Sequence, residues 1–188
     1  MDQRVLKTRK SLREALLLIL GEKPIAHISV KEICDRSHTG RVTFYTHYKD
    51  KYDLLDDCLQ DLHETIIARF DVLEQENNPD LDLTQFFLNI IDSILDVRRS
   101  YQFSSLVNNS DTLFRYYHFL MDNLQVFEKK WGKDFQTKYD KRQLYSFLVL
   151  GFGGFMHAKG PGPAKSPQEL RGEAHLLVRD LVASGIFS

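Results

Sequence analysis

The sequence predicts an all-α protein with a small N-terminal domain and a larger C-terminal helical domain. Through most of the 188 residues, apolar side chains recur three and four residues apart, the spacing that places them on one face of a helix. Two Ser-x-x-Glu pairs, beginning at Ser29 and Ser166, have the pattern of a helix N-terminus. We expect about nine helices, in domains spanning residues 1–52 and 53–188.

The first helix is expected over Val5–Leu20, because Gly21 and Pro24 supply stop signals after it. Its apolar face consists of Leu12, Ala15, Leu16 and Ile19. Cations gather near its start, at Arg4, Lys7, Arg9, Lys10 and Arg13. They could form a solvated face, but their position beside the segment described next favours contact with phosphates.

A second helix is expected to begin at Ser29, whose hydroxyl and backbone N–H can exchange hydrogen bonds with Glu32. It runs to about Ser37. The residues from Ser37 to Gly40 then form a break of the length found in a helix-turn-helix, and His38 is among the side chains that tolerate a left-handed conformation.

A third, short helix is expected over Arg41–His47. Phe44 and Tyr48, four residues apart, face inward, while Arg41, Thr43 and His47 face outward. Asp50 is placed to cap the next helix, with Asp53 at the capping-box position.

This stretch resembles the DNA-binding domain of the TetR family of bacterial transcription regulators. The resemblance covers about the first third of the chain and rests on Ile33, Tyr45, His47, Tyr48 and Lys51 at fixed spacing. Three positions depart from the family pattern, since His38 and Thr39 replace a Gly and an apolar residue, and Gly40 stands where Ser is common. The resemblance implies a three-helix helix-turn-helix domain followed by a helical ligand-binding and dimerisation domain.

The resemblance also implies the DNA contacts. Arg41 would pair with guanine, and Thr43 would meet a base or a thymine methyl group. The remaining expected DNA-binding residues are Ser29, Thr39, Tyr45, His47 and Lys51, most of them on phosphates. Tyr48 is assigned to core packing, whereas packing and phosphate contact remain equally open for Tyr45.

Charge is distributed unevenly along the chain. Residues 1–51 hold 11 Lys or Arg against 6 Asp or Glu, and the remaining residues hold 14 against 20. The positive end therefore coincides with the motif, as binding to a polyanion requires.

The larger domain is expected to begin with a long helix from Lys51 to about Gln75, interrupted by Glu76–Asp80. The further helices are expected over Leu83–Val97, Tyr101–Val107, Asp111–Trp131, Gln143–Ala158 and Pro167 to about Ala183.

In the resembled family, the last two long helices pair with those of a second subunit. The interface would contain Phe147, Gly151, Gly154, Phe155, Leu177 and Leu181, and a homodimer would bind a palindromic operator. The alternative is that both helices only complete a monomer core. No strand precedes the glycines, so they do not indicate a nucleotide loop.

Of the 22 aromatic residues, 16 lie between Phe86 and Phe155. They could be ordinary core, or they could line a pocket for a small hydrophobic or aromatic effector that relieves repression, as in the family. The candidate pocket residues are Phe103, Tyr116, Tyr117, Phe119, Trp131 and Tyr145.

Other functional classes are disfavoured or left as alternatives. No His-x-x-x-His pair, Gly-x-Ser-x-Gly elbow or paired carboxylates indicate an enzyme, and the sequence predicts neither a cofactor nor a metal site. With two isolated cysteines and no apolar run long enough to span a bilayer, the sequence predicts a cytoplasmic protein without membrane contact. A regulator or coactivator controlled by a protein partner remains the alternative.

Overall fold

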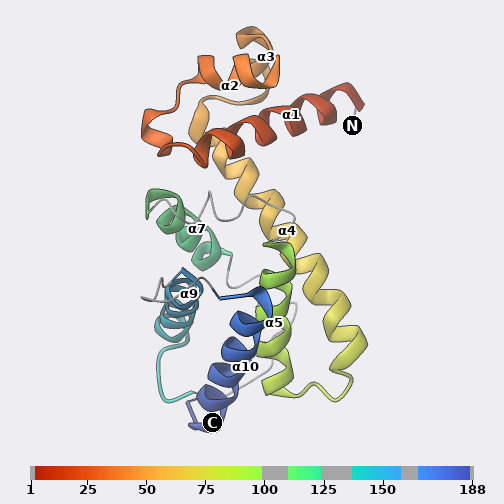
Figure 1. Cartoon of the computed structure of the whole chain (residues 1–188), viewed down its shortest axis with the longest axis vertical. Helices are drawn as coiled ribbons and strands as arrows, with labels where there is room; N and C mark the ends of the chain where they lie inside the picture. Colours follow the sequence, from red (N-terminus) through yellow and green to blue (C-terminus); the bar gives the residue numbers. More distant parts are fainter. Residues whose placement is uncertain (1–2, 99–109, 124–136, 158–164, 187–188) are drawn as a thin grey trace. The chain divides into compact units, whose positions relative to one another are not determined.

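The computed structural model describes residues 3–98, 110–123, 137–157 and 165–186. These ranges contain eight α-helices, one 3-10 turn and no strand (Figure 1). The predicted all-α architecture is confirmed for this part of the chain. The residues form two compact units that divide at Ile66 and Ile67, inside the long helix α4 (Lys51–Asn77). A domain boundary after residue 52 remains a prediction.

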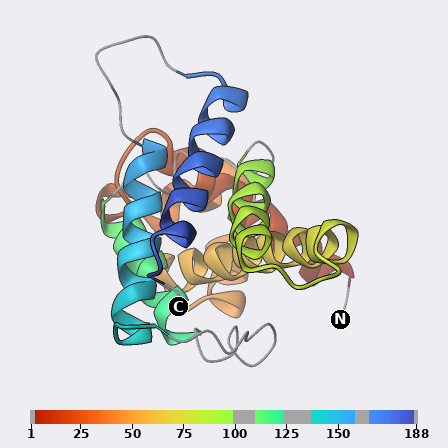
Figure 2. The same cartoon turned by 90° about the horizontal axis from the view of Figure 1, so that it is seen from below.

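The second unit contains the end of α4, the helix α5 (Leu83–Val97), most of α7 (Ser110–Asp122), α9 (Lys141–His157) and α10 (Pro167–Ala183). Helices α5 and α10 pack along each other, and α9 lies on the other side of α10 (Figure 2). The predicted bounds of α5 are confirmed, and the Ser166 cap of α10 forms the expected reciprocal bonds with Glu169.

Polar side chains cross the contact between α5 and α10. Asp92 accepts a hydrogen bond from His175 Nε2 at 2.8 Å and lies 3.3 Å from Arg171 Nη1. Asp96 contacts both Arg171 Nη2, at 2.5 Å, and Arg69 Nε of α4, at 2.8 Å. The α5 carboxylates therefore fix the position of α10 along α5 and of the end of α4 beside it.

The helix predicted over Asp111–Trp131 is interrupted in the structure, because α7 ends at Asp122 and Asn123 is not helical. The Asn123 side chain donates to Phe119 O at 2.8 Å, and the Asn123 backbone N–H donates to the same carbonyl at 3.2 Å, so Asn123 closes the end of α7 with both of these groups. Residues 124–136, and the short helix expected over Tyr101–Val107, lie outside the described residues.

The first unit is built from α1 (Gln3–Leu20), the 3-10 turn η1 (Ile25–His27), α2 (Val30–Ser37), α3 (Arg41–His47) and the start of α4. Helix α1 packs on α2, and α2 packs on α3. The core between them consists of fully buried apolar side chains: Leu12, Leu16, Ile25, Ile28, Ile33, Phe44, Leu54, Leu55, Leu59 and Leu62.

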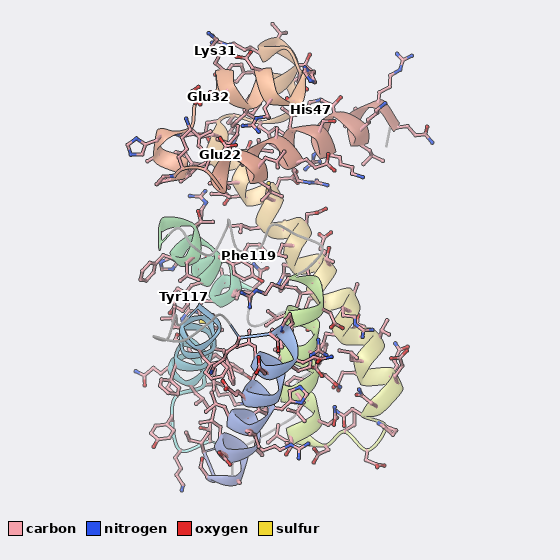
Figure 3. The ribbon with its side chains drawn as sticks, in the orientation of Figure 1. Glu22, Lys31, Glu32, His47, Tyr117 and Phe119 are labelled. Carbon is pink, nitrogen blue, oxygen red and sulfur yellow. The ribbon has the colours of Figure 1, made fainter. Side chains whose placement is uncertain are left out.

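The N-terminus of α2 is capped as predicted. Glu32 N–H donates to Ser29 Oγ at 3.2 Å, and Ser29 N–H donates to the Glu32 carboxylate at 3.0 Å. Lys23 Nζ lies 2.5 Å from the carboxylate of Glu32, which is labelled in Figure 3. The hydrogen bond from Lys23 and those from Ser29 lower the pKa of Glu32 to about 2.

The turn after α2 depends on a residue with positive φ. His38 has a φ of 52° and a ψ of 35°, which confirms the left-handed conformation expected there. Its position lets Thr39 N–H donate to Cys34 O at 2.9 Å, which closes the helix end. Gly40 then serves as the N-terminal residue before α3, without a side-chain cap.

Asp50 caps α4, since its carboxylate accepts from the N–H groups of Tyr52 at 2.7 Å and Asp53 at 2.9 Å. Asp53 reaches back to Lys49 N–H at 2.8 Å, one residue beyond the partner used in a capping box. Through these hydrogen bonds, the Asp50 and Asp53 side chains fix the segment between α3 and α4.

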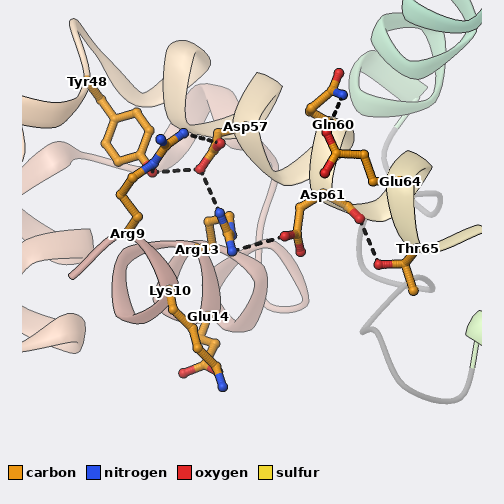
Figure 4. Close-up of polar contacts among 10 residues, drawn as sticks. All are labelled: Arg9, Lys10, Arg13, Glu14, Tyr48, Asp57, Gln60, Asp61, Glu64 and Thr65. Atoms are coloured by element: carbon orange, nitrogen blue, oxygen red, sulfur yellow. Dashed lines mark hydrogen bonds and ion pairs between the residues drawn. The ribbon is translucent and has the colours of Figure 1, made fainter. Parts of the chain in front are cut away.

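Asp57 on α4 is the meeting point of α1, α4 and the end of α3 (Figure 4). It lies 2.5 Å from Arg9 Nη2 and 3.0 Å from Arg13 Nη1, and it accepts the Tyr48 hydroxyl at 2.7 Å. Arg9 Nε donates to the same hydroxyl at 3.2 Å, and Arg13 also pairs with Asp61 at 3.0 Å. This set of five residues is the Asp57 cluster.

Burial opposes the ionisation of Asp57, but hydrogen bonds from Tyr48 and Arg13 and the charges of both arginines outweigh it and lower its pKa. Burial and the neighbouring Asp57 carboxylate raise the pKa of Tyr48, which keeps its hydroxyl protonated as a donor. The cluster is therefore held by an ionised carboxylate and a neutral phenol at neutral pH.

We expect Asp57→Asn to lower the free energy of unfolding by about 2 kcal/mol at pH 7, because two guanidinium groups and one hydroxyl lose a charged acceptor. The folded-state pKa of Asp57 lies below the unfolded value. Its stabilisation is thus complete above an ordinary carboxyl pKa of about 4 and is lost as the pH falls through the folded value. Urea unfolding at a series of pH values should show the difference between wild type and variant shrinking below about pH 4.

Asp35→Asn is the matched control, because Asp35 is exposed on α2 and the substitution removes the same charge from the same unit. It should change the free energy of unfolding by no more than about 0.5 kcal/mol. Equal losses for the two variants, or an Asp57 difference that does not depend on pH, would contradict this role.

Within the described residues, no helix is both long enough and apolar enough to cross a membrane.

Candidate nucleic-acid interface

Helix α3 has one buried side and one open side. Phe44 is completely buried, and Tyr48, which follows the helix, is 4% exposed, so the predicted packing role of Tyr48 is confirmed. On the other side, Val42 is 82% and Tyr45 57% exposed. Arg41, Thr43 and Thr46 are also exposed.

The exposed surface of α3 carries several kinds of binding group. Arg41 supplies hydrogen-bond donors and positive charge, Thr43 a hydroxyl, and Val42 only methyl groups. Thr46 Oγ1 donates to Thr43 O at 2.7 Å, so that hydroxyl is turned back onto the helix. A surface of this composition can contact both polar and apolar edges of bases.

The other residues expected at DNA also belong to the first unit. Ser29 is exposed at the start of α2, and its hydroxyl already bonds Glu32. Thr39 is half-buried in the turn, where its hydroxyl donates to Ser37 O at 3.3 Å. His47, labelled in Figure 3, is half-buried at the end of α3, and its ring lies 6.3 Å from that of Tyr48.

Lys51 has a structural role that its sequence position does not reveal. Its ammonium group donates to Ala26 O at 3.0 Å and to Ile28 O at 2.8 Å, which ties the start of α4 to the segment before α2. An ammonium has three donors, so one N–H is still available to a phosphate. Any loss of Lys51 would affect both the fold of the unit and its charge.

Several cations at the start of the chain are paired within the unit. Arg9 and Arg13 belong to the Asp57 cluster, Lys23 pairs with Glu32, and Arg36 lies 2.8 Å from Glu22. Because of these pairs, fewer cations are available to phosphates than the 11 Lys and Arg residues counted in residues 1–51. Other cations of this unit are exposed, among them Lys31, Arg41 and Lys49.

The aromatic residues expected to form a pocket are only partly described. Phe103 and Trp131 lie outside the described residues. Tyr116 and Phe119 of α7 stack with ring centroids 6.2 Å apart, and burial raises the pKa of Tyr116. Tyr117, labelled with Phe119 in Figure 3, shares a hydrogen bond of 2.9 Å with Ser146 Oγ on α9, and Tyr145 beside it is half-buried.

The residues expected at a dimer interface lie on α9 and α10. Phe147 is 62% exposed, Gly151 and Gly154 are exposed, and a Cβ atom added at either glycine would meet no described atom within 4 Å. Phe155, Leu177 and Leu181 are half-buried. Leu176, which was not predicted, is 64% exposed on α10.

Three features were missed by the sequence reasoning. The exposure of Val42 could have been inferred from its angular position on a helix whose buried residues are Phe44 and Tyr48. The Asp57 cluster and the carbonyl contacts of Lys51 carry no local pattern, because their partners lie far away in the sequence.

Comparison with known proteins finds similarity to transcriptional regulators. No protein-family model matches the chain. Over 98 residues, 52% of its length, the chain is 30% identical to YxbF of Bacillus subtilis (strain 168), an uncharacterised HTH-type transcriptional regulator. The match spans only 26% of that relative, about a quarter of its length.

Three solved structures are similar over nearly the whole chain. A putative TetR-family transcriptional regulator from Syntrophomonas wolfei has a TM-score of 0.67 at 18% identity, covering 94% of this chain and 95% of its own. A transcriptional regulator from Aquifex aeolicus has a TM-score of 0.61 at 20% identity, covering 93% and 99%.

A TetR transcriptional regulator from Streptococcus agalactiae has a TM-score of 0.56 at 19% identity, covering 94% of this chain and 96% of its own. All of these similar proteins are described as transcriptional regulators and none as an enzyme. In its helical architecture, this chain has the fold of the TetR-family transcriptional regulators.

Proposed function

We propose that this protein is a sequence-specific, DNA-binding transcriptional regulator of the TetR family, with the first unit as its DNA-binding part. The observation that carries the proposal is the open side of α3. All residues of this short helix from Arg41 to Thr46 are exposed except Phe44. Two of the exposed residues, Val42 and Tyr45, are large and apolar or aromatic. The fold of the unit gains nothing from exposing the large apolar or aromatic ones, whereas a helix inserted into the major groove brings its open side against bases and backbone.

The support of α3 fits the same use. Helix α2 packs on α3, and the turn between them contains the left-handed His38, which supports a helix-turn-helix. Base readout requires a helix that does not shift on its support. The Asp57 cluster provides that support at the end of α3.

The proposed contacts divide into base and phosphate contacts. Arg41 and Thr43 meet base edges, while Ser29, Thr39, Tyr45, His47 and Lys51 meet the backbone. In this assignment Lys51 uses the third N–H of its ammonium group, while the Ser29 hydroxyl must exchange its hydrogen bond to Glu32 for one to a phosphate. The backbone contacts set affinity and its salt dependence, and the base contacts set the preferred sequence.

The proposed assembly is a homodimer that binds a palindromic operator. One short helix contacts only a few base pairs, so two copies related by a two-fold axis are needed for a specific site. The support for the interface is the exposed apolar face of α9 and α10, where Phe147 and Leu176 are both more than 60% exposed and the α9 glycines meet no described atom. A second copy would cover this face and use the space beside Gly151 and Gly154 for close helix contact.

The proposed control is release of DNA by a small hydrophobic or aromatic molecule that binds among the aromatic residues of the second unit. The stacked Tyr116 and Phe119 rings and the Tyr117–Ser146 hydrogen bond supply apolar surface with one polar pair, the composition of a small-molecule site. The molecule must bind the DNA-free form more tightly than the DNA-bound form. A repressor would be relieved in this way.

DNA fragments selected from a random duplex library by the purified protein should share one palindromic motif. On that duplex, Arg41→Ala should cost about 1–3 kcal/mol and relax the preference at one base pair of each half-site. Lys51→Ala should weaken selected and random duplexes alike, lower the salt slope by about one unit, and also lower the melting temperature because two carbonyls lose their donor. Equal losses on both duplexes for Arg41→Ala would contradict its base contact.

The dimer interface is tested by Phe147→Asp. The buried carboxylate should shift the protein from dimer to monomer in sedimentation analysis and weaken binding to the palindrome more than to a single half-site. Leu81→Asp is the control, since Leu81 is 65% exposed outside the proposed interface and its φ of 55° suits Asp. A monomeric wild type, or a dimer that survives the charge at position 147, would contradict the proposed interface.

A thermal-shift screen of aromatic compounds tests control by a small molecule. A compound that raises the melting temperature should also weaken operator binding, because ligand binding and DNA binding are linked. Compounds that stabilise the protein without changing DNA affinity would contradict this control and favour regulation through a protein partner.

A further inference from the structure

The rotation of α3 about its axis identifies the residues that point furthest from the protein. Successive residues of an α-helix are about 100° apart around the axis. The buried side of α3 is defined by Phe44 and Tyr48. On this geometry Val42, Thr43 and Thr46 lie within about 60° of the opposite direction, whereas Arg41 lies on a flank, close to the buried pair.

Val42 has no role in the fold of the unit. At 82% exposure it makes little contact with the chain, and it is more exposed than any other large hydrophobic residue in the described ranges. A β-branched residue is also a weak helix former, so Val42 does not favour the short helix that contains it. Its position at the outermost part of α3 is therefore better explained by what lies outside the chain.

Thr46 extends the same apolar surface. It stands one helical turn after Val42, and its hydroxyl is engaged with Thr43 O at 2.7 Å. With the hydroxyl turned back onto the helix, the methyl group is the part of Thr46 that remains for an outside contact. Val42 and Thr46 together present methyl groups on the outer line of a helix that also carries Arg41.

We propose that Val42, assisted by the Thr46 methyl group, is a specificity-determining residue that recognises the C5-methyl group of thymine in the major groove. This inference rests on the proposed DNA-binding function. Thymine is the one base that displays a methyl group in that groove, and aliphatic side chains distinguish it by apolar contact. The operator half-site then contains a thymine facing Val42, beside the base pair that Arg41 contacts.

The test replaces individual thymines by deoxyuridine, which removes only the methyl group. The duplex is the one selected by the wild-type protein from a random library, and each thymine of the half-site is replaced in turn, in both half-sites. At one or two positions the replacement should raise Kd about threefold to tenfold per half-site, the range expected for losing one buried methyl contact. The same replacement should have less than about a twofold effect on Val42→Ala.

Two further variants separate side-chain loss from damage to the fold. Thr46→Ser removes the Thr46 methyl group and keeps the hydroxyl that bonds Thr43 O, so it should reduce the deoxyuridine effect without lowering the melting temperature. Leu18→Ala removes an exposed apolar side chain from α1 of the same unit and should keep the full deoxyuridine effect.

The possible outcomes distinguish the two levels of the proposal. If the wild type selects no sequence from the library, both the DNA-binding function and the role of Val42 are wrong. If it selects a motif but every deoxyuridine replacement is neutral, or costs wild type and Val42→Ala equally, only the role of Val42 is wrong. A loss confined to wild type and to particular thymines supports the assignment.

Discussion

The position of α3 depends on the contacts that hold its carboxyl end. The helix has only seven residues, too few to remain helical in water by its own hydrogen bonds. Phe44 anchors one side in the core, and the Tyr48 hydroxyl is held between Asp57 of α4 and Arg9 of α1. Because Arg13 meets the same carboxylate, one ionised group joins the elements that surround α3. The exposed side of α3 is thus presented by a fixed support.

Fewer cations of the N-terminal segment are available to DNA than its charge count indicates. The charge count of the first 51 residues treats every cation as available to DNA, but Arg9, Arg13, Lys23 and Arg36 already face carboxylates within the unit. Paired cations still contribute to the long-range field, yet they release few counterions on binding. Specific contacts by α3 must then supply a larger share of the affinity, which gives an apolar base contact by Val42 more weight.

The parts of the fold that follow local rules were predictable from the sequence. The Ser29 cap, the bounds of α3 and α5 and the left-handed His38 depend on residues a few positions apart. The Asp57 cluster joins residues more than 40 positions apart, and no spacing rule indicates such a pairing. The inward positions of Phe44 and Tyr48 were also predictable, but the exposure of Val42 was missed, because an apolar residue is commonly assigned to a core.

The claim that the open side of α3 is the DNA surface is tested most directly by amide hydrogen exchange, measured by mass spectrometry with and without the selected duplex. We expect DNA to slow exchange in peptides that cover α2, the turn at His38 and α3, with a smaller effect at the start of α1. Unchanged exchange in α3 at a duplex concentration that saturates the protein, or protection confined to the second unit, would contradict the account.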